Sequence, residues 1–190
     1  MAGLREQWRR SAMQTIQERA LDLFDERGFA AVTIEQVAAA ADVSPSSVYR
    51  YFGTKEGLLV ADEFDSMDDG ALAALLDPAD PVGSMVRVVQ RYEAPDDAEG
   101  SGATARRRVR YFFTEPSVRA AVCGVLDRAA GRVAPLLTAG GLTATQARVV
   151  AHAVAFGYFA ALESWFDDGG QRPIAGYVEE GLAPLRRIWA

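Results

Sequence analysis

The side chains best suited to binding a charged partner gather in a short stretch of the chain. A helix that starts near Pro45 would turn several hydrogen-bond donors to one outer face. They are the hydroxyls of Ser46, Ser47 and Tyr49 and the guanidinium of Arg50, with the ammonium of Lys55 following the helix. Such groups donate hydrogen bonds to phosphate oxygens and to the edges of bases. This stretch therefore favours nucleic-acid binding.

Residue types used in catalysis or metal binding are sparse. The single histidine, His152, has no identifiable partners for a Ser-His-Asp or Cys-His arrangement, and the single cysteine, Cys123, lies in an apolar segment that favours inert packing. The acidic run from Asp62 to Asp69 has no His or Cys beside it, so we interpret it as a solvated helix face. We therefore expect a protein that is not an enzyme, without a metal site or cofactor.

Two short helices joined by a tight turn are expected to carry the donor face. Thr33 and Gln36 have the spacing of a capping box, which starts a helix. Asp42 tolerates the left-handed conformation of a turn, and Ser44 followed by Pro45 starts a second helix. The residues expected to point inward are Ile34, Val37, Ala38, Ala41, Val43, Val48 and Phe52. This pattern predicts a helix-turn-helix.

The same stretch resembles the DNA-binding signature of the TetR family of transcriptional regulators. The matching positions are Thr33, Ile34, Val37, Ala38, Ala41, Val43, Ser44, Tyr49, Tyr51, Phe52, Lys55 and Leu58. Asp42 and Ser46 depart from the pattern, since glycine is common at both positions. We expect Ser46 to change how closely the backbone approaches DNA.

The resemblance implies an all-α homodimer with two domains. Residues 1–53 would form the three-helix DNA-binding domain, and residues 54–190 the larger helical domain for ligand binding and dimerisation. A small-molecule effector would shift the linker helix and change the separation of the two recognition helices. A palindromic double-stranded DNA operator with half-sites roughly 34–36 Å apart would suit such a dimer.

The resemblance also assigns DNA contacts to eight residues. They are Thr33 and Ser44, which also cap helices; Tyr49 and Lys55, expected on phosphates; Ser46, Ser47 and Arg50, expected to face the groove; and Tyr51, which either contacts DNA or packs in the core. Of these, Arg50 is suited to reading guanine.

The net charge of −6 disfavours binding to nucleic acid by bulk electrostatics. Even residues 1–60 carry seven basic and eight acidic side chains, a net charge of −1. The placement of the basic residues must therefore provide the binding. We expect residues 1–10 to form a basic, flexible arm with Trp8 as a candidate anchor. Contact of this arm with the minor groove or with phosphates, and a frayed terminus without a role, are equal alternatives.

The rest of the chain predicts further helices and no strand. They are expected at about 11–27, 54–76, 82–91, 114–137, 143–167 and from 174 onward. The run from Arg106 to Arg110 is interpreted as a solvated helix face that balances nearby acids. Residues 143–167 are apolar nearly all round, which favours burial against a second subunit, with Phe159 and Leu162 as candidate interface residues. Pro184 predicts a kink or an early stop in the last helix.

Helical phase suggests a ligand pocket of aromatic, nearly uncharged character, which would suit an apolar or aromatic effector. Its candidate residues are Phe64, Met67, Tyr92, Phe112, Cys123, Leu126, His152 and Phe156, and for each of them ordinary core packing is an equal alternative. His152 either has a partner that serves the fold or waits for a polar group of the ligand.

Two function classes remain open on the sequence. The preferred one is a ligand-responsive DNA-binding repressor, expected in the cytoplasm because the chain shows no signal peptide and its longest apolar run is too short to cross a membrane. The alternative is a helical enzyme or carrier with a vestigial helix-turn-helix. Lys55 favours the repressor, because the only lysine among twenty basic residues stands at the lysine position of the motif.

Overall fold

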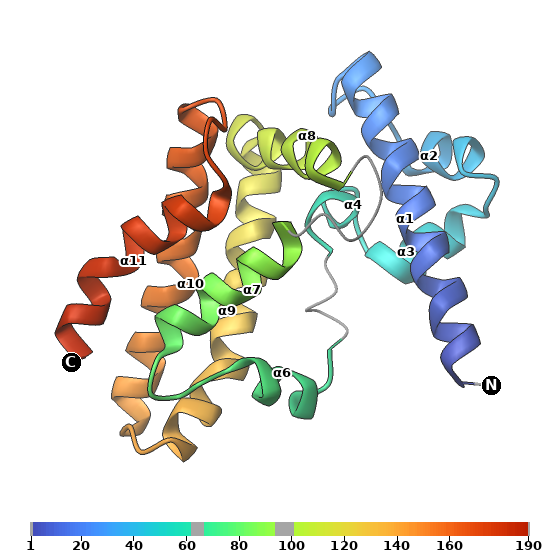
Figure 1. Cartoon of the computed structure of the whole chain (residues 1–190). Coiled ribbons are helices and arrows are strands. Elements are labelled where there is room, and N and C mark those ends of the chain that lie inside the picture. The colour runs from blue at the N-terminus through green and yellow to red at the C-terminus, as the bar shows by residue number, and fades with distance from the viewer. Residues whose placement is uncertain (1, 62–66, 94–100, 190) are drawn as a thin grey trace. The chain divides into compact units, whose positions relative to one another are not determined.

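The computed structural model describes residues 2–61, 67–93 and 101–189; the side chains of residues 2–7, 92, 101–105 and 187–189 are not described. Over these ranges the chain is helical and has no strand, which confirms the all-α prediction. The helices are α1 (Ala2–Arg27), α2 (Ile34–Ala40), α3 (Pro45–Phe52), α4 (Gly57–Val60), α6 (Asp69–Leu75), α7 (Pro81–Glu93), α8 (Ser101–Thr114), α9 (Pro116–Ala139), α10 (Ala144–Asp167) and α11 (Ile174–Trp189) (Figure 1).

The chain divides into two compact units. The amino-terminal unit comprises Met1–Ala61 and Ala103–Ala121, and the carboxy-terminal unit comprises Asp62–Gly102 and Val122–Ala190. The first unit thus contains most of α8 in addition to the helix-turn-helix. The functional division expected after residue 53 stays a prediction.

The core of the amino-terminal unit forms around the apolar face of α1. Ile16, Ala20 and Phe24 are buried there as their four-residue spacing predicts. Gly28 ends α1 in the left-handed conformation (φ 83°), and Phe29 packs back on Phe24 with ring centroids 5.0 Å apart. Because these contacts are local in sequence, the capping and stripe rules were sufficient to predict them.

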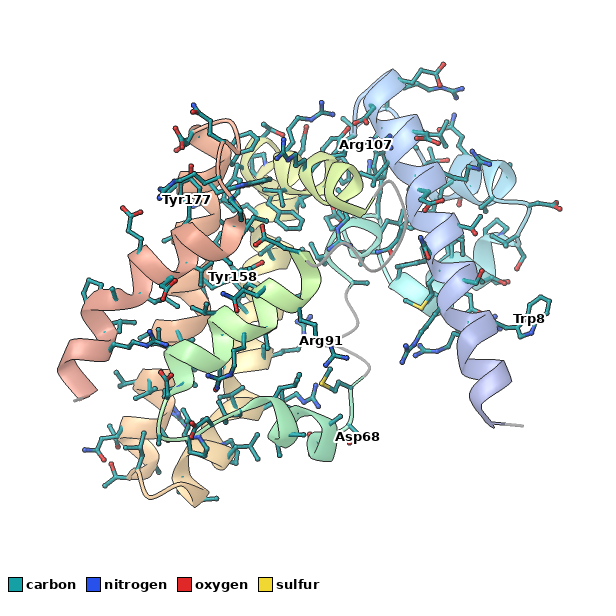
Figure 2. All side chains as sticks on the ribbon, in the orientation of Figure 1. Trp8, Asp68, Arg91, Arg107, Tyr158 and Tyr177 are labelled. Atoms are coloured by element: carbon teal, nitrogen blue, oxygen red, sulfur yellow. The ribbon has the colours of Figure 1, made fainter. Side chains whose placement is uncertain are left out.

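The amino-terminal arm departs from the prediction. Helix α1 begins at Ala2, so the segment expected to be a flexible arm continues the first helix. Trp8 is 75% exposed and projects from α1 (Figure 2), so it anchors nothing in this unit. The basic residues near the start of the chain are therefore presented on a helix.

The single linker helix expected over residues 54–76 is also wrong. Helix α4 ends at Val60, and Ala61 has extended backbone (ψ 128°). A separate helix, α6, begins after Asp68, whose carboxylate accepts a hydrogen bond from the Ala71 amide at 2.8 Å. An aspartate in this position caps a new helix and does not continue an old one.

Helices α10 and α11 pack along each other in the carboxy-terminal unit, and α7 packs against both (Figure 1). Gly157 permits a close approach, because a β-carbon there would lie 2.5 Å from Cδ2 of Leu182. The last helix continues past Pro184 to Trp189, so it does not stop early, and the kink that was the other expectation stays a prediction.

Helix α10 is long and apolar enough to cross a membrane by length and composition, contrary to the expectation from its apolar run. However, nine of its side chains are buried within the protein, including Phe159 and Leu162. Thr143 and Gln146 form a capping box at its start. This pattern is that of a core helix, and the two residues expected at a subunit interface are buried within the chain itself.

Candidate nucleic-acid interface

The helix-turn-helix forms by the local rules that predicted it. The Thr33 hydroxyl accepts from the Gln36 amide at 3.3 Å, and the Gln36 side chain accepts from the Thr33 amide at 2.9 Å. Asp42 makes the turn in the left-handed conformation (φ 54°), and Ser44 caps α3 by accepting from the Ser47 amide at 3.2 Å. The capping box, the aspartate turn and the serine cap are confirmed.

The outer face of α3 carries the predicted donors. Tyr49 is 49% exposed, Ser46 and Arg50 are exposed, and Ser47 is half-buried, while Val48 and Phe52 lie in the core. The Ser44 hydroxyl lies 2.9 Å from the hydroxyls of both Ser46 and Ser47. Three hydroxyls therefore cluster at the amino end of α3, at the positive end of the helix dipole, which favours anions.

Arg50 is held by its neighbour. Its guanidinium lies over the ring of the half-buried Tyr51, 4.9 Å from the centroid, and donates to the Tyr51 hydroxyl at 3.3 Å. Tyr51 also meets Phe52 edge-on at 6.4 Å. Tyr51 thus supports Arg50 from its own helix. It is neither fully buried in the core nor fully exposed for contact with DNA, the two alternatives expected for it.

Lys55 has a role within the fold that the sequence did not indicate. Its ammonium donates to the carbonyl oxygens of Phe29 at 2.8 Å and Val32 at 3.1 Å, and it lies 4.3 Å from the centroid of the Phe29 ring. The lysine therefore fixes the turn between α1 and α2, just before Thr33. The phosphate contact expected of Lys55 stays a prediction.

The candidate pocket residues differ in burial where the structure describes them. Phe64 lies outside the described residues, as does the side chain of Tyr92. Phe112 is buried in the amino-terminal unit. Of the candidates in the carboxy-terminal unit, Met67, Cys123 and Leu126 are half-buried. The pocket inferred from helical phase stays a prediction for these residues, because helical phase does not show which neighbours a helix meets.

His152 has partners from its own chain. Its Nδ1 lies 2.8 Å from the carbonyl oxygen of Arg148 and its Nε2 3.1 Å from a carboxylate oxygen of Asp127 on α9. The side chain is 34% exposed and stacks on Phe156. Each ring nitrogen thus faces an acceptor of the protein itself, which favours the role in the fold, although the site is at the surface and not in the core.

An ion-pair cluster joins α8 to α1, and sequence reasoning found only part of it. Asp25 accepts from Arg107 at 2.6 Å, Arg110 at 2.5 Å and the Tyr111 hydroxyl at 2.7 Å. Arg107 also binds Asp22 at 2.8 Å. The expectation that the arginine run balances acids is confirmed for these two arginines. The central place of Tyr111 was missed, because nothing local relates it to a residue 86 positions earlier.

Asp25 is held as a carboxylate and Tyr111 as a neutral donor. Burial acts to raise the pKa of Asp25, but hydrogen bonds from Tyr111 and Arg107 and the guanidinium charges outweigh it and keep the pKa below 3.8. Burial raises the pKa of Tyr111 to about 12, and the Asp25 carboxylate adds to this shift. The cluster therefore keeps one charge pattern at neutral pH.

Comparisons with known proteins agree with the helix-turn-helix. Residues 16–61 match the family described as bacterial regulatory proteins, tetR family. Among curated proteins, the chain is 27% identical over 144 residues to the HTH-type transcriptional regulator TcmR of Streptomyces glaucescens, covering 72% of this chain and 63% of TcmR. It is 36% identical over 77 residues to the HTH-type transcriptional regulator BetI of Rhizobium meliloti (strain 1021), covering 37% of this chain and 38% of BetI. The matches thus span less than two thirds of either relative.

The fold as a whole resembles a solved repressor. The crystal structure of NalD, the secondary repressor of the MexAB-OprM multidrug efflux pump in Pseudomonas aeruginosa, aligns over 94% of this chain and 96% of NalD. The TM-score is 0.55 at 20% sequence identity, which shows a shared fold. Within the segment that matches the family, the capped α2, the Asp42 turn and the donor face of α3 take the arrangement that the motif requires. Residues 16–61 therefore resemble the tetR family of bacterial regulatory proteins in sequence, and the chain shares the fold of NalD.

Proposed function

We propose that the protein is a DNA-binding transcriptional regulator, a repressor that a small apolar or aromatic molecule releases from its operator. The observation that carries this proposal is the outer face of α3, where Ser46, Tyr49 and Arg50 are exposed. Surface residues kept only for folding have no need of such a concentration of donors. The regulatory class of TcmR and BetI supports the same function.

The donors divide by the part of DNA that they suit. Thr33, Ser44 and Tyr49 lie where hydroxyls would meet phosphates and fix the register of the protein on the duplex. Arg50 presents a planar guanidinium that can bind O6 and N7 of guanine together, while Ser46 and Ser47 read neighbouring base edges. Tyr51 supports Arg50 from behind through its hydroxyl and ring.

A homodimer on a palindromic operator completes the proposal. One α3 reads only a few base pairs, so two copies spaced by one helical turn provide the affinity that a net charge of −6 does not. The effector would bind in the carboxy-terminal unit, where Met67, Cys123 and Leu126 remain half-buried. It acts by preferring the conformation that cannot span both half-sites, which lowers DNA affinity by its differential affinity.

The function is tested by selecting duplexes from a random 30-base-pair library with the wild-type protein. We expect enrichment of an inverted repeat. On the enriched duplex, Arg50→Ala should cost about 1–3 kcal/mol of binding free energy and relax the preference at one base position in each half-site. The matched control is Arg91→Ala, an exposed arginine in the carboxy-terminal unit, which should bind as the wild type does.

Two outcomes would contradict the proposal. If the wild-type protein enriches no sequence, the helix-turn-helix is vestigial and the enzyme or carrier alternative gains support. If Arg50→Ala weakens every sequence equally, Arg50 contacts phosphate and the base-reading role is wrong.

A further inference from the structure

Three serine hydroxyls at the start of α3 form one hydrogen-bonded group. The Ser44 hydroxyl lies 2.9 Å from the hydroxyls of both Ser46 and Ser47, and it accepts from the Ser47 amide at 3.2 Å. A serine hydroxyl has one hydrogen to donate and two lone pairs with which to accept. The Ser47 amide occupies one lone pair of Ser44, so one lone pair and one hydrogen remain for the two neighbouring hydroxyls.

This count limits what Ser46 and Ser47 can offer to a partner. Ser44 donates to one of them and accepts from the other, because it has a single hydrogen and a single remaining lone pair. The hydroxyl that receives the Ser44 hydrogen keeps its own hydrogen for a partner. The other hydroxyl has donated its hydrogen to Ser44 and presents only lone pairs. The two side chains together therefore present one donor and one acceptor.

Arg50 on the same face of α3 has a different character. Its guanidinium contains only donors, one of which the Tyr51 hydroxyl accepts at 3.3 Å. It therefore suits two adjacent acceptors, such as O6 and N7 of guanine. Arg50 follows Ser46 by four residues and Ser47 by three, so it lies one turn further along this face. One turn rises about 5.4 Å, which corresponds to one or two base-pair steps of about 3.4 Å.

A base edge with one donor and one acceptor matches the serine pair. Adenine presents such an edge in the major groove, with the N6 amino group as donor and N7 as acceptor, and cytosine presents an N4 amino group. The edge of guanine has two acceptors. Two hydroxyls with one hydrogen between them satisfy only one of these acceptors, and a desolvated acceptor without a donor is unfavourable.

We propose that Ser46 and Ser47 are specificity-determining residues that select a base with an exocyclic amino group, within two steps of the guanine bound by Arg50. The Ser44 hydroxyl orients the pair, which leaves the phosphate contacts of hydroxyls to Thr33 and Tyr49. This inference rests on the proposed function and adds to it the class of base that the start of α3 recognises.

The first measurement changes the DNA and leaves the protein intact. In the duplex enriched by the wild-type protein, each amino-bearing base within two steps of the guanine is replaced in turn by an analogue without the amino group. Unsubstituted purine replaces adenine, and 2-pyrimidinone replaces cytosine, so the two arms show which amino group is bound. We expect one replacement to weaken binding about fivefold, as the loss of one hydrogen bond does. The same replacement outside the enriched repeat is the control for weaker base pairing.

Protein variants connect this effect to the serines. With Ser46→Ala and Ser47→Ala combined, the analogue should cost less than about twofold, because no hydroxyl remains to accept from the amino group. The matched control is Ser117→Ala, since Ser117 is also an exposed serine directly after a proline at a helix start, here that of α9. This control should keep the fivefold cost.

The role of Ser44 is tested with Ser44→Gly, because glycine starts a helix nearly as well as serine does. Without the shared hydroxyl both neighbours can donate outward. Discrimination against guanine at the position of the amino-bearing base should therefore fall from at least about fivefold to less than about twofold. Unchanged discrimination would overturn the orienting role.

If no analogue weakens binding of the wild-type protein, or if the cost is the same in the double variant, the inference is wrong while operator binding stands. If the wild-type protein enriches no duplex, the proposed function fails and the inference fails with it.

Discussion

Lys55 shows how far one side chain can be interpreted from a motif. Its position matches the DNA-binding signature, yet its ammonium is already bonded to the carbonyls of Phe29 and Val32. Lys55→Met keeps most of the apolar stem and removes both bonds. We expect it to lower the free energy of unfolding by about 1–3 kcal/mol, because hydrogen bonds to charged groups contribute that much and two carbonyls lose their donor.

Denaturant unfolding measures the stability loss, and the salt dependence of operator binding measures the phosphate role. If Lys55 acts only within the fold, the slope of log affinity against log salt should be unchanged in Lys55→Met. A slope reduced by about one unit, at wild-type stability, would instead show that Lys55 neutralises a phosphate.

At the residue scale, hydrogen bonds between partners close in sequence could be predicted, and those between partners far apart in sequence could not. Thr33 with Gln36 and Ser44 with Ser47 are three residues apart, so helix geometry alone determines their hydrogen bonds. The partners of Lys55 are 23 and 26 residues away, and Asp127 is 25 residues from His152. Such pairs depend on how helices pack, which one sequence does not show.

At the scale of elements, α7 and α11 are joined by Asp80. Its carboxylate accepts from the Gly83 amide at 2.8 Å and from Arg186 of α11 at 3.1 Å and 3.2 Å. Gly83 leaves room for this pair, because a β-carbon there would lie 1.9 Å from Asp80 Oδ2 and 2.6 Å from Arg186 Nη2. The glycine, the aspartate and the arginine therefore act together to hold one helix end.

This junction should make stability depend on pH. Burial acts to raise the pKa of Asp80, but the Gly83 amide and the Arg186 guanidinium outweigh it and keep the pKa below its ordinary 3.8. A carboxyl with a lowered pKa stabilises the fold above its unfolded pKa, and this stabilisation is lost as the pH falls through the folded pKa. Asp80→Asn should therefore melt earlier than the wild type at pH 7, with a difference that shrinks below about pH 4.

Asp77→Asn is the control, because Asp77 lies in the same turn and its carboxylate bonds only the nearby Ala79 amide among its described contacts. If the difference in melting temperature between Asp80→Asn and the wild type does not change with pH, the hydrogen bond with the Gly83 amide stabilises the junction and the charge of Asp80 does not.

Element prediction succeeded where caps and apolar stripes agree and failed where they compete. The apolar phase continues across residues 54–76, but the extended Ala61 and the Asp68 cap divide the segment. Conversely, Pro184 lacks the backbone N–H that would donate a hydrogen bond within the helix, yet α11 continues to Trp189. Leu182, 1% exposed and packed at Gly157, keeps this helix in place by tertiary contact.

At the scale of the whole molecule, the apolar character of α10 predicts that a second subunit packs against it. The residues expected at that interface, Phe159 and Leu162, were the wrong ones. Phe159 and Leu162 are 5% and 2% exposed within the protomer, so Glu in their place would disrupt the core. Val149 and Phe156 are instead 62% and 38% exposed. They are seven residues apart and share a face of the helix, and we propose that a second copy of the chain covers this apolar stripe.

Phe156→Glu should therefore produce a folded monomer. A charge in the centre of a desolvated contact is strongly unfavourable, while an exposed position on a protomer tolerates it. Sedimentation at about 10 µM should show a wild-type dimer and a monomeric variant, and the variant should lose at least about tenfold in operator affinity because one recognition helix binds alone.

Gln171→Glu adds the same charge at an exposed turn and should remain dimeric. A wild-type monomer, or a Phe156→Glu dimer with unchanged affinity, would place the interface elsewhere; helical content measured by circular dichroism distinguishes a true monomer from an unfolded chain.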